Sequence, residues 1–88
     1  MSAQITVLYF AAASTATGIS EEQIEIPEEG CSLSRLKEVL VSKYPETNLK
    51  EVLETSEWSV NAEMVENASI VRLKGGEEVA VICPVSGG

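Results

Sequence analysis

The stretch QITVLYF at residues 4–10 decides the fold, because almost every side chain from Ile5 to Phe10 is apolar. Such a run is typical of a strand that is buried on both faces, which predicts a central place in a sheet. A second stretch, EEVAVIC at 77–83, contains another near-continuous apolar run. We therefore expect two neighbouring central strands, one from each end of the chain. If these strands are parallel, a crossover connection must join them.

The segment between these strands contains the clearest helix, SLSRLKEVLVSKYP, which begins at Ser32. Ser32 predicts an N-cap, since its hydroxyl can accept a hydrogen bond from a free backbone N–H. Pro45 cannot continue a helix, so we expect the helix to span 32–44. Its apolar side chains recur at helical spacing, at Leu33, Leu36, Leu40 and Tyr44.

Shorter elements fill the remainder of the chain. EQIEIP at 22–27 alternates polar and apolar residues, as a half-exposed strand does. The small residues at 11–18 predict a turn or short helix, and a second helical stretch begins near Asn48. Strand-like stretches follow at 57–65 and 66–73, with a glycine turn at 74–77. This order predicts an α+β roll, a mixed sheet with one main helix packed across one face.

The composition is that of one small acidic domain. The chain has 88 residues and a net charge of −8, from 14 acidic and 6 basic residues. Nucleic-acid binding relies on clustered Lys and Arg, so the charge argues against such a partner and favours a solvated surface or a basic partner protein. No apolar run approaches the roughly 20 residues that cross a bilayer, so we expect no membrane association. With no export signal, we expect the cytosol.

Chemically reactive side chains are few. The chain has no histidine and two cysteines, Cys31 and Cys83. A zinc site needs about four ligands, so we expect no metal, and nucleophilic sites that pair Ser or Cys with His cannot be built from this chain. Nothing in the sequence lowers the pKa of either thiol, so we expect both cysteines to be inert. We expect Trp58 to pack in the core rather than to bind a ligand.

The most specific pattern is the final stretch LKGGEEVAVICPVSGG at 73–88. Together with VLYFA at 7–11 and VNAEMV at 60–65, it makes the chain resemble the small, sulfur-carrier subunit of molybdopterin synthase, a family of ubiquitin-like β-grasp proteins. The resemblance spans almost the whole chain. The sequence departs from it at Cys83, where the family usually has a proline, and at Glu77, where aspartate is common.

The resemblance implies a β-grasp domain at residues 1–83 and a flexible, extended C-terminal tail at 84–88. It also implies a sulfur carrier that is not an enzyme on its own. A ubiquitin-activating-like enzyme would use ATP to adenylate the Gly88 carboxylate, and sulfur would then displace AMP to leave a thiocarboxylate. The tail would enter the active site of the large synthase subunit and donate its sulfur to cyclic pyranopterin monophosphate. The small subunit would bind no cofactor, and two small and two large subunits would form a heterotetramer.

The composition of the tail suits this chemistry. Gly87 and Gly88 lack a Cβ, which lets the backbone pass through a narrow channel and lets reactants approach closely. Pro84 cannot donate to a strand ladder, so pairing should weaken there and the tail can leave the sheet. Val85 and Ser86 extend the tail towards the partner. These residues are therefore the expected reacting end and the expected partner-binding segment.

Anchoring must come from the globular surface. Phe10 and Ile82 end the two expected central strands, close to where the tail departs. We expect them to line an apolar docking patch, because aromatic and apolar anchors are common at the centre of interfaces. The alternative is that both are ordinary core residues.

Other functions stay open at this stage. A ubiquitin-like modifier conjugated to lysines, or a carrier for tRNA thiolation, would use the same Gly-Gly end. A plain interaction domain without tail chemistry would not need that end at all.

Overall fold

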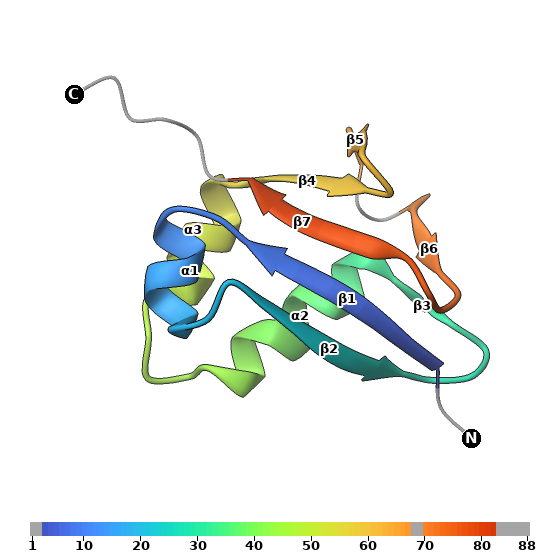
Figure 1. Ribbon diagram of the computed structural model, residues 1–88, viewed down its shortest axis with the longest axis horizontal. Coiled ribbons are helices and arrows are strands. Elements are labelled where there is room, and N and C mark those ends of the chain that lie inside the picture. Colours follow the sequence, from blue (N-terminus) through green and yellow to red (C-terminus); the bar gives the residue numbers. More distant parts are fainter. Residues whose placement is uncertain (1–2, 68–69, 83–88) are drawn as a thin grey trace.

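A computed structural model describes residues 3–67 and 70–82 of the chain (Figure 1). The predicted segment 66–73 therefore lies only partly among the described residues, and the tail lies outside them. The strands and helices follow one another in the order β1 (Ala3–Tyr9), α1 (Ala12–Thr17), β2 (Glu21–Ile26), β3 (Cys31–Ser32), α2 (Leu33–Lys43), α3 (Leu49–Thr55), β4 (Glu57–Val60), β5 (Glu63–Val65), β6 (Arg72–Leu73) and β7 (Glu78–Ile82).

The main sheet has five strands in the order β2-β1-β7-β4-β5. β1 and β7 are parallel neighbours near its centre, and the other neighbouring pairs are antiparallel. The two apolar runs therefore lie side by side, as predicted, and α2 belongs to the long connection between them (Figure 1). A second, two-stranded sheet of β3 and β6 was not predicted, because each of its strands has only two residues.

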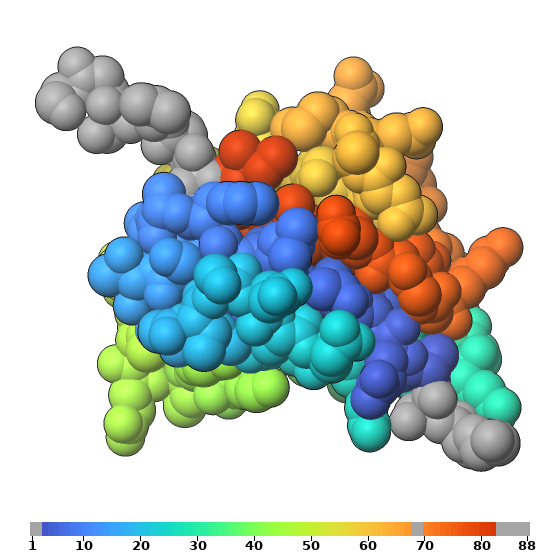
Figure 2. All heavy atoms as spheres, viewed as in Figure 1, coloured from blue at the N-terminus to red at the C-terminus, as the bar shows by residue number. Residues whose placement is uncertain are grey.

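The main helix α2 lies behind the main sheet in Figure 1, and the sheet face turned to the viewer in Figure 2 is not covered by any helix of the described residues. Along β1 the side chains alternate: Ile5, Val7 and Tyr9 are buried, whereas Thr6 and Leu8 are only half-buried. The prediction that this strand is buried on both faces is therefore wrong. β1 does lie inside the sheet, but only the side chains that point towards the helices enter the core. The α+β roll with one main helix across one face is confirmed.

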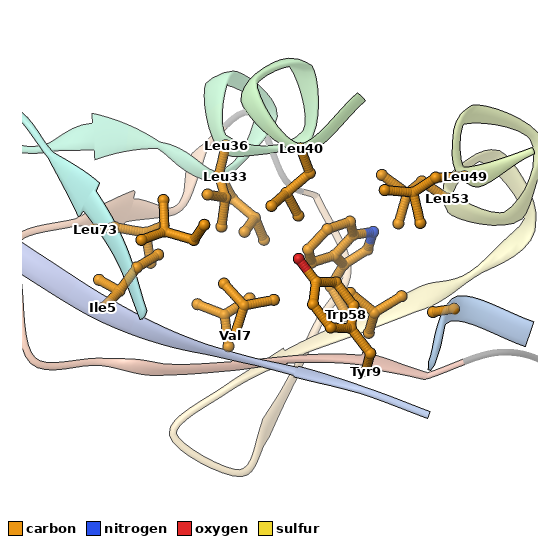
Figure 3. Packing of buried hydrophobic residues seen from close by; sticks show 14 of the residues in the cluster. Ile5, Val7, Tyr9, Leu33, Leu36, Leu40, Leu49, Leu53, Trp58 and Leu73 are labelled. Carbon is orange, nitrogen blue, oxygen red and sulfur yellow. The ribbon is translucent and has the colours of Figure 1, made fainter. Parts of the chain in front are cut away.

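The core lies between the sheet and the helices (Figure 3). The predicted cap of α2 is confirmed, since the Ser32 hydroxyl accepts a hydrogen bond from the Arg35 N–H at 3.1 Å. Trp58 is buried in the core, as predicted, and the Lys37 Nζ lies 5.9 Å from the centroid of its ring. The helices contribute the fully buried or nearly fully buried side chains Leu33, Leu36, Leu40, Leu49 and Leu53.

A glycine turn fixes β7 against β1. The Gly76 N–H donates to the Gln4 carbonyl at 2.7 Å, and the Thr6 N–H donates to the Glu77 carbonyl at 3.0 Å. Gly75 has a φ of 131°, and a Cβ at this position would lie 2.7 Å from the Cβ of Ala3. Glycine is therefore required there by both backbone conformation and space. The turn sets the register between the two central strands.

The Glu77 side chain closes this turn. Its carboxylate accepts hydrogen bonds from the N–H groups of Lys74, at 2.7 Å, and Gly75, at 2.6 Å. Partial burial raises the pKa of this carboxyl group, but the backbone hydrogen bonds outweigh burial and hold the pKa below its ordinary value. The charged form of Glu77 thus stabilises the turn.

A polar contact attaches the end of α2 to β2. The Glu22 carboxylate lies 3.0 Å from the Lys43 Nζ and accepts a hydrogen bond from the Tyr44 hydroxyl. Burial and the hydrogen bond to Glu22 raise the pKa of Tyr44 to about 12. Tyr44 therefore stays protonated at neutral pH and keeps donating to Glu22.

Candidate functional site

The described part of β7 ends at Ile82, between β1 and β4. Tyr9 pairs with Val81 in the parallel ladder, and Glu57 pairs with Ile82 in the antiparallel one. Phe10 follows Tyr9 directly, so Phe10 and Ile82 come to the same end of the sheet. Phe10 is 49% exposed and Ile82 is half-buried. Phe10 is therefore not a core residue, and its role in docking stays a prediction.

The residues expected to carry the chemistry lie outside the described part of the chain. These residues are Pro84, Val85, Ser86, Gly87 and Gly88, and Cys83, which we expect to be inert, lies outside the described residues too. The expected domain boundary between 83 and 84 lies there too. What the structure does give is the point from which they start, since residue 83 follows Ile82 at the end of a central strand.

Further apolar side chains lie on the open face beside this point. The ladders place Leu8 next to Ala80, Ala80 next to Ser59, and Ser59 next to Met64, in one row across β1, β7, β4 and β5. Met64 is 54% exposed. We call this surface the exit patch; it consists of Leu8, Phe10, Met64, Ala80 and Ile82, of which Ala80 is buried, and the buried Ser59 separates Ala80 from Met64.

Sequence reasoning missed three members of the exit patch. Leu8 and Ala80 lie two residues before Phe10 and Ile82, so strand alternation could have placed them on the same face. Met64 could not be found this way, because its place depends on the β4–β5 hairpin. Asn61 holds this hairpin against β7: its side-chain oxygen accepts from the Glu78 N–H at 3.0 Å, and its N–H donates to the Glu78 carbonyl at 2.8 Å.

A sharp turn follows Phe10. The Ala13 N–H donates to the Phe10 carbonyl at 3.0 Å, and Ala11 between them has a φ of 50° and a ψ of −123°. Residues other than glycine rarely adopt a positive φ, and such strained residues cluster at functional surfaces. The turn directs the chain from β1 straight into α1 at the edge of the exit patch.

The described residues offer little chemistry of their own. Cys31 is buried, and burial raises the pKa of its thiol, so the thiol stays protonated. Within residues 3–67 and 70–82, no three His, Cys, Asp or Glu side chains are grouped to hold a metal ion. In the same part of the chain, no helix has the length and apolar character needed to span a membrane. The exit patch is therefore the feature of the described residues on which a function can be argued.

A central parallel pair in a mixed sheet, a helix packed across one face and a C-terminus that follows the central strand define a ubiquitin-like β-grasp protein. The comparisons place it further within that class. Residues 7–88 match the ThiS family. The chain belongs to this family, among the sulfur carrier subunits of molybdopterin synthase.

Three similar proteins document this relationship. The molybdopterin synthase sulfur carrier subunit of Mycosarcoma maydis is 41% identical over 86 residues, which cover 96% of this chain and 92% of that protein. A solved structure of molybdopterin converting factor subunit 1 from Pyrococcus furiosus is 27% identical, with a TM-score of 0.79 over 94% of this chain and 99% of that one. A chain in the complex of subunits 1 and 2 of molybdopterin-converting factor from Helicobacter pylori is 27% identical, with a TM-score of 0.64 over 97% of this chain and 99% of that one.

Proposed function

We propose that the chain carries sulfur on the carboxyl group of Gly88 and donates it to cyclic pyranopterin monophosphate, in the active site of a large synthase subunit. The observation that carries this proposal is the position of the exit patch. The described part of β7 ends at Ile82, on the same face of the sheet as the exposed side chains of Phe10, which follows β1, and Met64 of β5. A partner that docks there would receive the tail directly.

The reaction needs activation of the carboxyl group. A carboxylate is a poor electrophile, so the Gly88 oxygen first attacks ATP, which releases pyrophosphate and leaves a glycyl adenylate. A sulfur nucleophile then displaces AMP and leaves the thiocarboxylate, so that one difficult step becomes two easier ones. A ubiquitin-activating-like enzyme would supply the ATP site and the acid–base groups, since this chain has no histidine.

The tail residues would serve access rather than catalysis. Gly87 and Gly88 would present no side chain near the carbonyl that is attacked, and Pro84 has no N–H to donate to a strand ladder, which would favour departure of the tail from the sheet. Val85 and Ser86 would lie in the entrance of the large subunit. Ordering such a tail costs about 1–2 kcal/mol for each backbone residue that is fixed, so docking of the globular surface has to offset that cost.

The exit patch would supply this docking energy. Phe10 and Ile82 would enter apolar pockets of the large subunit, with Leu8 and Met64 around them. The Helicobacter pylori relative is solved in a complex of its two subunits, which supports a partner of this kind for the present chain. A heterotetramer of two small and two large subunits and a cytosolic location stay predictions.

Deletion of Gly88 tests the proposal. We expect the shortened chain to unfold at the same temperature as the full chain, and to lose both sulfur acceptance and synthesis of molybdopterin with the large subunit. Intact-mass measurement after reaction with the activating enzyme should show exchange of one oxygen for sulfur in the full chain only. Full synthesis by the shortened chain would refute the proposal.

The same mass measurement separates the alternative functions. A protein modifier would appear as a covalent adduct of larger proteins. A carrier for tRNA thiolation would form the same thiocarboxylate but would not support molybdopterin synthesis with the large subunit.

A further inference from the structure

Charge is divided unevenly between the sheet and the rest of the chain. All six basic residues lie outside the five strands of the main sheet, at Arg35, Lys37, Lys43, Lys50, Arg72 and Lys74. The same five strands carry six glutamates, at Glu21, Glu22, Glu25, Glu57, Glu63 and Glu78. The net charge of the chain does not show this division. The division becomes visible only once the five strands are known to form one sheet.

The strand register assigns four of these glutamates to the open face. Glu21 lies opposite Leu8, and Glu57 lies opposite Ile82. Glu78 and Glu25 lie on the same face, opposite Thr6 and Gln4. All four side chains are exposed.

Glu22 shows the contrast with these four residues. It lies on the helix side of β2, where its carboxylate is 3.0 Å from the Lys43 Nζ. On the covered side of the sheet, Glu22 therefore forms an ion pair with Lys43. On the open side, Glu21, Glu57 and Glu78 lie next to members of the exit patch, and Glu25 lies further along β2 on the same face. The strands that carry them bear no Lys or Arg.

We infer that the exit patch fits a partner surface with an apolar centre and a rim of Lys and Arg, and that the four open-face glutamates prevent the patch from pairing with a second copy of this chain. The inference rests on the proposed function, in which the partner is the large synthase subunit. Two copies joined through this face would place glutamates against glutamates, which costs free energy, whereas a basic rim would be attracted. The four open-face glutamates thus favour a basic partner over a second copy of this chain at the exit patch.

This arrangement affects the rate of association most. Exposed charges at the rim of an interface attract an oppositely charged partner before contact, and they change the association rate more than the dissociation rate. Salt screens this attraction, since the Debye length is about 8 Å at physiological ionic strength. Apolar contacts of Phe10 and Ile82 would then hold the complex together with little dependence on salt.

Two variants with the same change in net charge test the inference. The face variant carries Glu21→Gln, Glu25→Gln, Glu57→Gln and Glu78→Gln. The control variant carries Glu38→Gln, Glu46→Gln, Glu51→Gln and Glu54→Gln, which are exposed positions outside the main sheet. Thermal unfolding of both variants, each in the full chain, confirms that they fold.

Association rates with the large subunit are then measured at several salt concentrations. We expect the wild-type rate to fall steeply with salt, and the rate of the face variant at low salt to be about 10-fold lower and nearly independent of salt. The control variant should keep most of the wild-type rate and its salt dependence. A wild-type rate that does not depend on salt, or an equal loss in the two variants, would overturn the inference about the partner.

Sedimentation of each protein alone tests the second half of the inference. We expect the wild type and the control variant to stay monomeric at concentrations where the face variant forms dimers. A face variant that stays monomeric would overturn the role in preventing self-association. Failure of the proposed function would look different, because the wild type would then not bind the large subunit at any salt concentration.

Discussion

The two faces of the main sheet are formed by alternate residues of the same strands, but one face is buried and the other is exposed to a much greater degree. On the covered face Ile5, Val7 and Tyr9 are at most 1% exposed and pack against the helices. On the open face the alternate positions of the same strand lead from Thr6 through the half-buried Leu8 to Phe10, which is 49% exposed. One face therefore stabilises the fold and the other is available to a partner, although their residues alternate along one chain. Substitutions on the two faces should have separable effects.

The largest separation is expected between Leu36→Ala and Phe10→Ala. Leu36 is fully buried, so its truncation removes core contacts and should lower the free energy of unfolding by about 2–5 kcal/mol. Phe10→Ala should change that free energy by less than about 1 kcal/mol, but weaken binding to the large subunit by about 2 kcal/mol or more if Phe10 is an anchor. Urea unfolding and titration calorimetry measure the two quantities. Equal loss of stability in both variants would remove the distinction between the faces.

The assignment of residues to faces depends on the register of β1 and β7, and Gly75→Ala should disturb that register. The new methyl group would meet the Cβ of Ala3 at 2.7 Å, whereas a Cβ at Gly76 has nothing within 4 Å. Both glycines have a positive φ, so both changes carry backbone strain. We expect Gly75→Ala to cost about 1–3 kcal/mol more than Gly76→Ala in urea unfolding. A larger loss at Gly76 would contradict the contact with Ala3.

The Glu77 carboxylate in the same turn should make the free energy of unfolding depend on pH. The folded state holds the pKa of this carboxyl group below its unfolded value, so its stabilisation is present above the unfolded pKa and is lost as pH falls through the folded pKa. We expect Glu77→Gln to lower the free energy of unfolding by about 1 kcal/mol at neutral pH and to have little effect in acid. Urea unfolding across this pH range measures the difference. A constant difference at all pH values would exclude the charge of Glu77 as its cause.

The smallest expected effect lies at the boundary between the faces, at Ala11. Glycine accepts the positive φ of this residue without strain, so Ala11→Gly should raise the free energy of unfolding by about 0.5–1 kcal/mol. Ala12→Gly is the matched control, because Ala12 begins α1 and glycine in a helix lowers stability by a similar amount. Opposite shifts in thermal unfolding are the expected result. Shifts of the same sign would argue against strain at Ala11.

Much of the fold followed from local sequence patterns. The two central strands, the Ser32 cap, the short strands at 57–65 and the glycine turn at 74–77 were predicted correctly, since each depends on neighbouring residues. Burial of β1 on both faces was predicted wrongly. Composition cannot show how many layers of helix a sheet has, and here the helices cover a single face.

The site was predictable in part. Phe10 and Ile82 were placed near each other because each ends an expected central strand, and the ladders confirm that neighbourhood. The places of Met64 and of the four open-face glutamates could not be predicted, because they depend on how β2, β4, β5 and β7 pair. Pairing register is a long-range property that a single sequence does not display.

The parallel pairing of β1 and β7 also determines where the molecule can be handled. β1 starts at the end of the sheet opposite to the one where β7 finishes, and its seven residues separate the two ends by about 20 Å. A purification tag, fluorescent label or surface tether attached ahead of Ala3 would therefore stay clear of Phe10 and Ile82. Immobilised this way, the protein would present both its sheet face and its carboxyl end to an incoming enzyme.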